Sequence, residues 1–388
     1  MADEDQLFDA IERLEWDERN EHDVPFKRLR QITRRTALTG GAAGLVALAL
    51  EACGSSAANT SASGRASTAS KIFGDRRRLS FTFVNHATTN NFFTPTRNGA
   101  ADACKLLGCS YRWTGSQTSN VSEMVNAIDI AAGAHSHGIA TTLIDPTAFN
   151  APVSKALAAG VPVVAYNSDV PGNPRLAYIG QNNFTSGQLM GRRIASLVPS
   201  GDVALFIATP GQLNLQPRIN GALDALKSYP AIRPHTVPSG AIEPQELPFI
   251  TSYMKSKPRF RGFFAVDGGS TAATARALQQ TGLAKKGVKG GGYDLTPVTE
   301  RLLAAGYIQF AIDQQPYLQG FMPILELYLH NATHGLTGPA DVDTGRRFLD
   351  KSSVQTYVTT RSRYEGTGTA VGVTSAGTDG ARLRGSGA

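Results

Sequence analysis

The strongest constraint on the fold is an alternation of short β-rich runs with Ala- and Leu-rich helical stretches, which extends from residue 79 to about residue 346. Strand–helix alternation at this spacing predicts an α/β fold built from doubly wound parallel sheets. The β-rich runs are LSFTFVN (79–85), GIATTLID (138–145), VPVVAYN (161–167), DVALFIAT (202–209), RGFFAVD (261–267), VKGGGYD (288–294) and IQFAID (308–313).

Roughly ten predicted strands are too many for one comfortable sheet, so we expect them to divide between two lobes. The length of 388 residues agrees with about two domains. In such sheets ligands bind outside the carboxyl ends of the strands. We therefore expect a ligand in the cleft between the lobes, and a disordered Gly/Thr/Ser-rich tail over residues 361–388.

Polar side chains gather at the carboxyl ends of the predicted strands. Carboxylates accept hydrogen bonds from hydroxyl groups, a guanidinium donates in a fork, and amides do both. Such a set suits a neutral, hydroxyl-rich molecule, with Phe92 and Phe93 as flat apolar faces for the C–H side of a sugar or polyol. The polar candidates are Asn90, Asn167, Asp169, Arg218, Asp267, Asp294 and Gln314.

Two simpler interpretations of these residues remain open. An Asp or Asn at a strand end can cap the following helix, although Arg218 and Gln314 are poor caps. Phe92 and Phe93 can fill a core, and whether both rings face a ligand stays undecided.

Motifs of enzymes and metal sites are absent from the sequence. It has no nucleophile elbow, P-loop or HExxH. The run GGGYD (290–294) does not have the GxGxxG pattern of a dinucleotide site. His135 and His137 lack an obvious carboxylate partner, and His86, nearer to the predicted cleft, has no evident acid–base partner. The sequence therefore predicts no catalytic residue, no metal site and no cofactor.

The N-terminal segment has the features of an export signal. A basic run precedes about 15 uncharged, mostly apolar residues, fewer than the about 20 that a membrane span needs. TRRTAL (33–38) resembles a twin-arginine export signal. LEAC (50–53) resembles a lipoprotein cleavage box, with Cys53 as the lipidated residue and Glu51 as an unusual member.

A buried helix is the alternative for this apolar run, but Gly40, Gly41 and Gly44 disfavour it. We expect an export signal over residues 1–52 and a flexible Ser/Ala/Gly-rich tether over residues 53–76. The folded body would then be extracytoplasmic, either anchored by lipid to the outer face of the cytoplasmic membrane or periplasmic.

Charge and cysteine content bear on the possible partners of the protein and on the state of its thiols. Residues 1–52 hold 7 basic and 11 acidic residues, and the rest of the chain holds 31 basic and 20 acidic ones. No dense basic stripe with interleaved aromatics occurs, so a nucleic-acid partner is not indicated. Cys104 and Cys109 are five residues apart, and in an exported protein they either pair as a disulfide or stay as buried thiols.

Seven motifs, taken in order, make the body resemble the ribose-type solute-binding proteins of ABC carbohydrate importers. These proteins have the type 1 periplasmic-binding-protein fold, which is shared with the sugar domain of LacI-like repressors. The resemblance covers about residues 79–358. The motifs are NNFF (90–93) with Gly99 beyond it, GVPVVAYNSD (160–169), AYIGQNNFTSGQLMG (177–191), RINGALDAL (218–226), FFAVDGGSTAATARAL (263–278), GYDLTPV (292–298) and AIDQQPYLQG (311–320).

The resemblance implies two lobes joined by three chain crossings, near residues 181–183, 313–316 and 341–344. It places residues 77–182 and 315–340 in the N-terminal lobe, and residues 183–314 and 341–360 in the C-terminal lobe.

It also implies roles for single residues. Asn90 would bond the sugar, Phe92 and Phe93 would stack on its ring, and Arg218, Asp294 and Gln314 occupy further ligand-binding positions.

The sequence departs from the ribose pattern at three places. Asn167 and Ser168 stand in place of an acid–arginine pair, with Asp169 next to them as a candidate replacement. Asp267 stands where ribose binders have an asparagine, and Ile242 aligns near a second stacking aromatic. The ligand is therefore expected to be another pentose, a hexose or a linear polyol.

The implied function is a monomeric receptor, not an enzyme, that delivers a small neutral carbohydrate or polyol to an ABC transporter permease when its lobes close. A sensor for a sugar or autoinducer stays open, because the same cleft serves both roles. A LacI-type regulator would need an N-terminal helix-turn-helix, and residues 1–70 hold the predicted signal and tether instead. An enzyme would need a nucleophile with its base, which the sequence does not show.

Overall fold

The computed structural model describes residues 78–240, 242–360 and 362–364. The predicted export signal, Cys53 and the tether lie outside the described residues, as does most of the predicted tail. All of the described residues belong to one compact unit. Within them, no helix combines the length and apolar character needed to cross a membrane.

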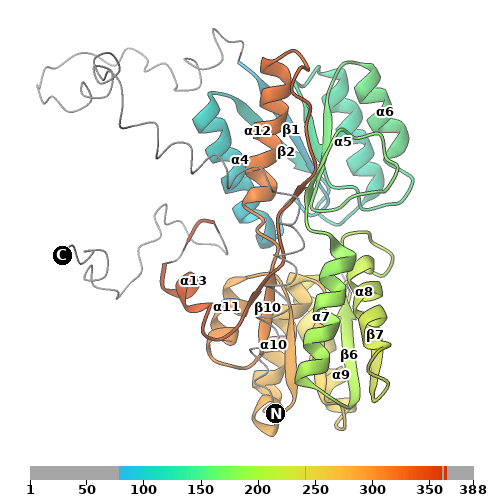
Figure 1. Cartoon of the computed structure of the whole chain (residues 1–388), viewed down its shortest axis with the longest axis vertical. Helices are drawn as coiled ribbons and strands as arrows, with labels where there is room; N and C mark the ends of the chain where they lie inside the picture. Colours follow the sequence, from blue (N-terminus) through green and yellow to red (C-terminus); the bar gives the residue numbers. More distant parts are fainter. Residues whose placement is uncertain (1–77, 241, 361, 365–388) are drawn as a thin grey trace, which may run out of the picture. The chain divides into compact units, whose positions relative to one another are not determined.

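The first sheet has six parallel strands (Figure 1). Their order is β11 (Val342–Asp343), β5 (Tyr178–Gly180), β4 (Val163–Tyr166), β3 (Ile139–Thr141), β1 (Ser80–Asn85) and β2 (Ser110–Gly115). Helices α4 (Thr94–Leu107) and α12 (Leu318–Ala332) cover one face, where they bury Phe81 and Phe83 of β1. Helices α5 (Val121–Gly133) and α6 (Asn150–Ala158) cover the other face and bury Val84.

The second sheet also has six strands. Their order is β12 (Arg347–Leu349), β10 (Phe310–Asp313), β9 (Lys289–Tyr293), β8 (Gly262–Ala265), β6 (Gly201–Ile207) and β7 (Ile232–Pro238). Leu205 and Phe264 pack against α7 (Asn183–Leu197) and α8 (Gln216–Leu226) on one face. Phe206 and Phe263 pack on the other face against α9 (Glu243–Ser256), α10 (Gly268–Thr281) and α11 (Pro297–Ala304).

The predicted fold class is confirmed: two α/β lobes are built on parallel sheets. Each quoted β-rich run contains a strand. Of the five further strands, β2, β7, β11 and β12 are sheet edges and β5 has three residues, so none needs a long apolar run. Strand β7 carries Pro234 and Pro238, which an edge tolerates. Strand β12 runs antiparallel to β10, a departure from the all-parallel expectation.

The chain crosses between the two sheets three times. It leaves β5 of the first sheet for α7 and β6 of the second, and it returns from β10 to α12 over residues 314–317. Strand β11 pairs with β5 in the first sheet and β12 pairs with β10 in the second, so the last crossing lies after Asp343. The expected start of the second-lobe segment at residue 341 is therefore too early, because the β11–β5 ladder holds residues 342 and 343 in the first lobe.

Candidate ligand-binding site

A pocket of about 610 Å³ is lined by residues that follow strands of both sheets. The first lobe contributes the turns after β1 and β2 and Asn167 after β4. The second lobe contributes the β6–α8 loop, the start of α10 and the ends of β9 and β10. Eight of the nine predicted ligand-binding residues line this pocket: Asn90, Phe92, Phe93, Asn167, Arg218, Asp267, Asp294 and Gln314.

Asp169 is the ninth predicted residue, and it does not line the pocket. The Nε of Arg175 donates to Asp169 Oδ1 at 2.8 Å, and Arg175 Nη1 donates to Asp341 Oδ1 at 2.9 Å. The carboxylate of Asp169 is thus engaged in an ion pair with Arg175 inside the β4–β5 connection, and Arg175 also ties this connection to Asp341 before β11. The expectation that Asp169 replaces the missing acid–arginine pair is not met by this geometry.

Arg218, in the first turn of α8, is a buried cation on the pocket wall, with 2% of its surface exposed. Its Nε donates to Asn183 Oδ1 at 3.0 Å, and its Nη1 donates to the carbonyl of Val266 at 2.9 Å. The guanidinium carbon lies 4.1 Å from the centre of the Tyr293 ring. Nη2 has no hydrogen-bond partner among the described residues. Three contacts therefore hold the group in place and leave one donor unused.

Asp294, Gln314 and Asn167 form a hydrogen-bonded chain across the two lobes. Gln314 Nε2 donates to Asp294 Oδ1 at 2.7 Å, and Asn167 Nδ2 donates to Gln314 Oε1 at 3.3 Å and to Gln319 Oε1 at 3.1 Å. Asn167 Oδ1 is buried without a partner among the described residues. Asn167 and Asp294 have left-handed φ angles of 64° and 69°, a conformation that Asn and Asp adopt more readily than most residues.

Burial raises the pKa of Asp294 to about 6, although Arg218 and the hydrogen bond from Gln314 act in the opposite direction. Burial likewise raises the pKa of Asp267, and the hydrogen bonds that it accepts from the amides of Ser270 and Ala208 act in the opposite direction.

Asp267 and Asn90 cap helices and line the pocket at once. Asp267 Oδ1 accepts from Ser270 N at 2.8 Å, and its Oδ2 accepts from Ala208 N at 3.1 Å. Asn90 Oδ1 accepts from Phe92 N at 2.9 Å in the turn before α4. The capping interpretation is therefore confirmed for both residues, and it is compatible with contact to a ligand.

The two aromatic rings after Asn90 differ in burial. Phe93 is 2% exposed and belongs to the core cluster under α4, and Phe92 is partly exposed. Their ring centroids lie 4.7 Å apart at an interplanar angle of 79°. Both rings line the pocket, so Phe93 is at once part of the core and part of the wall.

The pocket also includes residues that are not among the nine predicted ligand-binding residues. His86 follows β1, which is a strand-end signal, and its Nδ1 lies 3.1 Å from Thr142 Oγ1. Burial lowers the pKa of His86 to about 4, so the ring is neutral at pH 7. Asn214 lies in the β6–α8 loop and Glu246 in the first turns of α9, where no strand end marks them. Ile242, at the expected position of an aromatic, lines the pocket and is 57% exposed.

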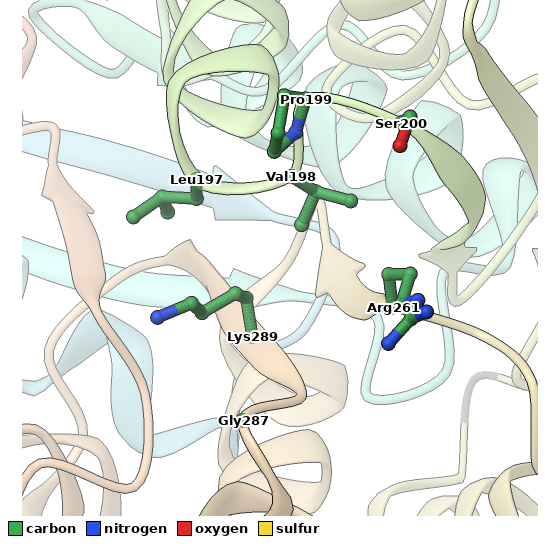
Figure 2. Close-up of a pocket in the computed structure, with 7 residues that line it drawn as sticks. All are labelled: Leu197, Val198, Pro199, Ser200, Arg261, Gly287 and Lys289. Atoms are coloured by element: carbon green, nitrogen blue, oxygen red, sulfur yellow. The ribbon is translucent and has the colours of Figure 1, made fainter.

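A second cavity, of about 250 Å³, lies at the amino ends of the second-sheet strands, away from the first pocket (Figure 2). It is lined by the end of α7 and by Arg261 and Lys289, at the start of strands β8 and β9. The charged ends of Arg261 and Lys289 point away from each other (Figure 2). They therefore do not converge on one anion, and the cavity does not form a recognisable site.

Comparison with known proteins places the chain in a family. Residues 81–331 match the family described as periplasmic binding protein domain, and the chain belongs to it. A xylose/arabinose-binding protein of Sulfolobus acidocaldarius, XylF, is 46% identical over an alignment of 308 residues, and the match covers 76% of this chain and 76% of that protein.

Solved structures agree with this assignment. An ABC transporter solute-binding protein of Burkholderia graminis, in complex with D-arabinose, superimposes with a TM-score of 0.67 and 27% identity over 72% of this chain and 97% of that one. AraP, an arabinose-binding protein of Geobacillus stearothermophilus, gives a TM-score of 0.60 and 25% identity over 72% of this chain and 98% of that one. The chain therefore has the fold of type 1 periplasmic binding proteins.

Proposed function

We propose that the protein is an extracytoplasmic receptor for a neutral pentose of the xylose and arabinose type. It binds the sugar in the pocket between its lobes and delivers it to an ABC transporter permease when the lobes close. The names of the relatives support the sugar class, since XylF is a xylose/arabinose-binding protein and the Burkholderia graminis protein was solved with D-arabinose.

The unused hydrogen-bonding capacity of the pocket wall is the observation that carries this proposal. Arg218 Nη2 is a buried donor without a partner among the described residues. Asn167 Oδ1 and Asn214 Oδ1 are buried acceptors that also lack a partner there. Each such group costs about 1–3 kcal/mol while it remains unpaired. A hydroxyl group both donates and accepts, so a sugar can satisfy all three.

The charge of the pocket favours a neutral ligand over a sugar acid. Asp267, Asp294 and Glu246 bring three carboxyl groups to the lining, and Arg218 brings one cation. A carboxylate ligand would add a further negative charge near these groups, and like charges in a poorly solvated site repel. Sugar hydroxyls can instead donate to the carboxylates.

The placement of the donors and acceptors supports closure of the lobes on the ligand. Asn90 and Asn167 belong to the first lobe, and Arg218, Asp267 and Asp294 belong to the second. A ligand that bonds to both sets stabilises the closed form by its difference in affinity for the two forms.

A thermal-shift panel tests the ligand class. We expect D-xylose or L-arabinose to raise the melting temperature, because a ligand at 100 times its Kd adds about 2.7 kcal/mol to the free energy of unfolding. The corresponding sugar acid, xylonate, should give no shift. A flat response across pentoses, hexoses and polyols would overturn the proposal.

Delivery to a permease needs a separate test in the cell. A strain that lacks the protein should lose high-affinity uptake of the labelled pentose. If uptake persists and a transcriptional response to the sugar is lost instead, the protein is a sensor.

The export signal and lipid anchor are also part of the proposal, and they rest on the sequence alone. Mass spectrometry of the mature protein should find Cys53 as a lipidated N-terminus. The variant Cys53→Ser should appear unlipidated and leave the membrane fraction. A mature protein that begins at Met1 would refute this part and leave the sugar site untouched.

A further inference from the structure

The C-terminal end of helix α4 brings two cysteines together. The helix ends at Leu107, and the next residue, Gly108, caps it with a left-handed φ of 73°. Gly108 N donates to Cys104 O at 2.8 Å, and Cys109 N donates to the same oxygen at 3.0 Å. In such a reversal, the side chains of the residue after the glycine and of the residue five positions earlier contact each other. The backbone itself thus places the thiols of Cys104 and Cys109 side by side.

The two thiols interact and differ in exposure. A hydrogen bond from the Cys104 thiol holds the pKa of Cys109 below its usual value, and the same bond together with burial raises the pKa of Cys104. Cys104 is buried among Phe81, Ala103 and Leu107, and Cys109 is partly exposed beside them. Cys109 is therefore the accessible partner that ionises first, which is the property of an attacking thiol.

The surroundings of the thiol pair do not suit a metal ion. Among the described residues, no group of three or more His, Cys, Asp or Glu side chains could hold one. The remaining cysteine of the chain is Cys53, which lies outside the described residues and is the proposed lipidation site. Cys104 and Cys109 are therefore each other's nearest candidate partner.

We propose that Cys104 and Cys109 form a disulfide in the exported protein and lock the end of α4 to the start of β2. The proposal rests on the proposed export for the oxidising compartment, because thiols in the cytosol are kept reduced. It does not depend on which sugar the pocket takes.

The oxidation proceeds by thiol–disulfide exchange with an external disulfide as oxidant. The Cys109 thiolate attacks one sulfur of that disulfide and releases one thiol. The Cys104 thiol then loses its proton and attacks the Cys109 sulfur, which releases the second thiol. Two protein thiols are oxidised to one disulfide, and the external disulfide gains the two electrons and two protons.

The position of the pair predicts an effect on stability without an effect on binding. Helix α4 has 14 residues, and the pocket residues Asn90, Phe92 and Phe93 lie at its other end. At 1.5 Å per residue the two ends are about 21 Å apart. A bond that closes the far end restricts the unfolded chain and leaves the pocket unchanged.

The test uses the full chain with Cys53→Ser, purified reduced and then equilibrated with oxidised glutathione. We expect a mass loss of about 2 Da, no thiol left to alkylate, and a melting temperature higher by about 2–6 °C. The pentose affinity should stay the same in both forms. The matched control, with Cys104→Ala and Cys109→Ala added, should show no shift between the two conditions.

Two results would overturn the proposal. One is a stable mixed disulfide with glutathione on Cys109, which shows that Cys104 does not complete the exchange. The other is that both thiols remain free after equilibration or in protein trapped with an alkylating reagent directly from the cell envelope. Failure of the sugar panel would leave these results unaffected, so the two proposals are separable.

Discussion

Arg218 is held by three protein contacts, and each of them orients the donor that remains. Asn183 and the carbonyl of Val266 take Nε and Nη1, and the Tyr293 ring lies against the guanidinium face. A planar fork can satisfy such partners and still present a nitrogen to a ligand, whereas a lysine ammonium at one point cannot. The residue therefore acts as a fixed donor in the wall of the pocket.

The substitution Arg218→Lys should weaken pentose binding by about 10- to 100-fold, because a hydrogen bond to a charged group is worth about 1.5–3 kcal/mol. Isothermal titration calorimetry measures the affinity, and circular dichroism shows that the fold persists. Arg276→Lys is the matched control, since Arg276 is exposed on α10. Equal affinities for the two variants would place the sugar elsewhere.

Asp294 should make the stability of the folded protein depend on pH. Its pKa is about 6 in the folded protein, and an aspartate in an unfolded chain has a pKa of about 4. The folded state holds the proton more tightly, so this contribution to stability is fully present below about pH 4 and is lost as the pH rises through 6. Relative to Asp294→Asn, the unliganded wild type should lose about 2–3 kcal/mol of unfolding free energy between pH 4 and pH 7.

Urea denaturation of both proteins at several pH values measures this difference. A difference that is constant from pH 4 to pH 7 would show that the Asp294 carboxyl is not perturbed by its burial.

At the scale of elements, strand ends could be predicted from the sequence and loop geometry could not. Most of the eight predicted residues that line the pocket follow a strand, and the carboxyl ends of parallel strands lie at the same end of each sheet. Arg218 instead lies in the first turn of α8. Asp169 also follows a strand, but its partner Arg175 lies on a connection whose path the sequence does not reveal. Asn214 and Glu246 reach the pocket from a loop and from a helix, which no periodicity marks.

Helices α4 and α12 lie side by side (Figure 1), and glycines lie at their contact. A Cβ at Gly99 would lie 2.1 Å from the carbonyl oxygen of Tyr317, and a Cβ at Gly320 would lie 1.8 Å from that of Thr96. These contacts are with backbone atoms, so side-chain rotation cannot relieve them. Gly99 belongs to the first of the seven motifs, NNFF with Gly99 beyond it, and the close contact with α12 explains why a glycine stands there.

The substitution Gly99→Ala should therefore destabilise the fold by about 1–3 kcal/mol or more, the usual cost of overpacking. Gly133→Ala is the control, because a Cβ at Gly133 on α5 meets no atom within 4 Å. There the better helix propensity of alanine should add up to about 1 kcal/mol. Chemical denaturation distinguishes the two, and a neutral Gly99→Ala would mean that the helices can separate without cost.

At the scale of the whole folded body, the sequence predicts two lobes but not how they contact each other, and one contact between them lies outside the pocket. Leu213, in the β6–α8 loop of the second lobe, donates its N–H to the carbonyl of Ile144 in the first lobe at 3.3 Å. Its side chain packs against the first-lobe core cluster that includes Leu143 and Ile144. Next to it, within the pocket lining, Asn214 Nδ2 lies 3.5 Å from His86 Nε2. No local pattern in the sequence indicates such a long-range contact.

The side chain of Leu213 does not line the pocket, although its neighbours Gln212 and Asn214 do, so we expect its loss to act on sugar affinity through the contact between the lobes. Removing three carbons from a half-buried leucine should cost about 1–2 kcal/mol of contact between the lobes, at about 0.8 kcal/mol per fully buried CH₂. If the sugar bonds to both lobes as proposed, Leu213→Ala should weaken binding about 5- to 30-fold, since every 1.4 kcal/mol is tenfold. Leu106→Ala, at an exposed position on α4, is the control in calorimetry. An affinity that Leu213→Ala leaves unchanged would show that the lobes close without this contact, and closure would then depend on the sugar alone.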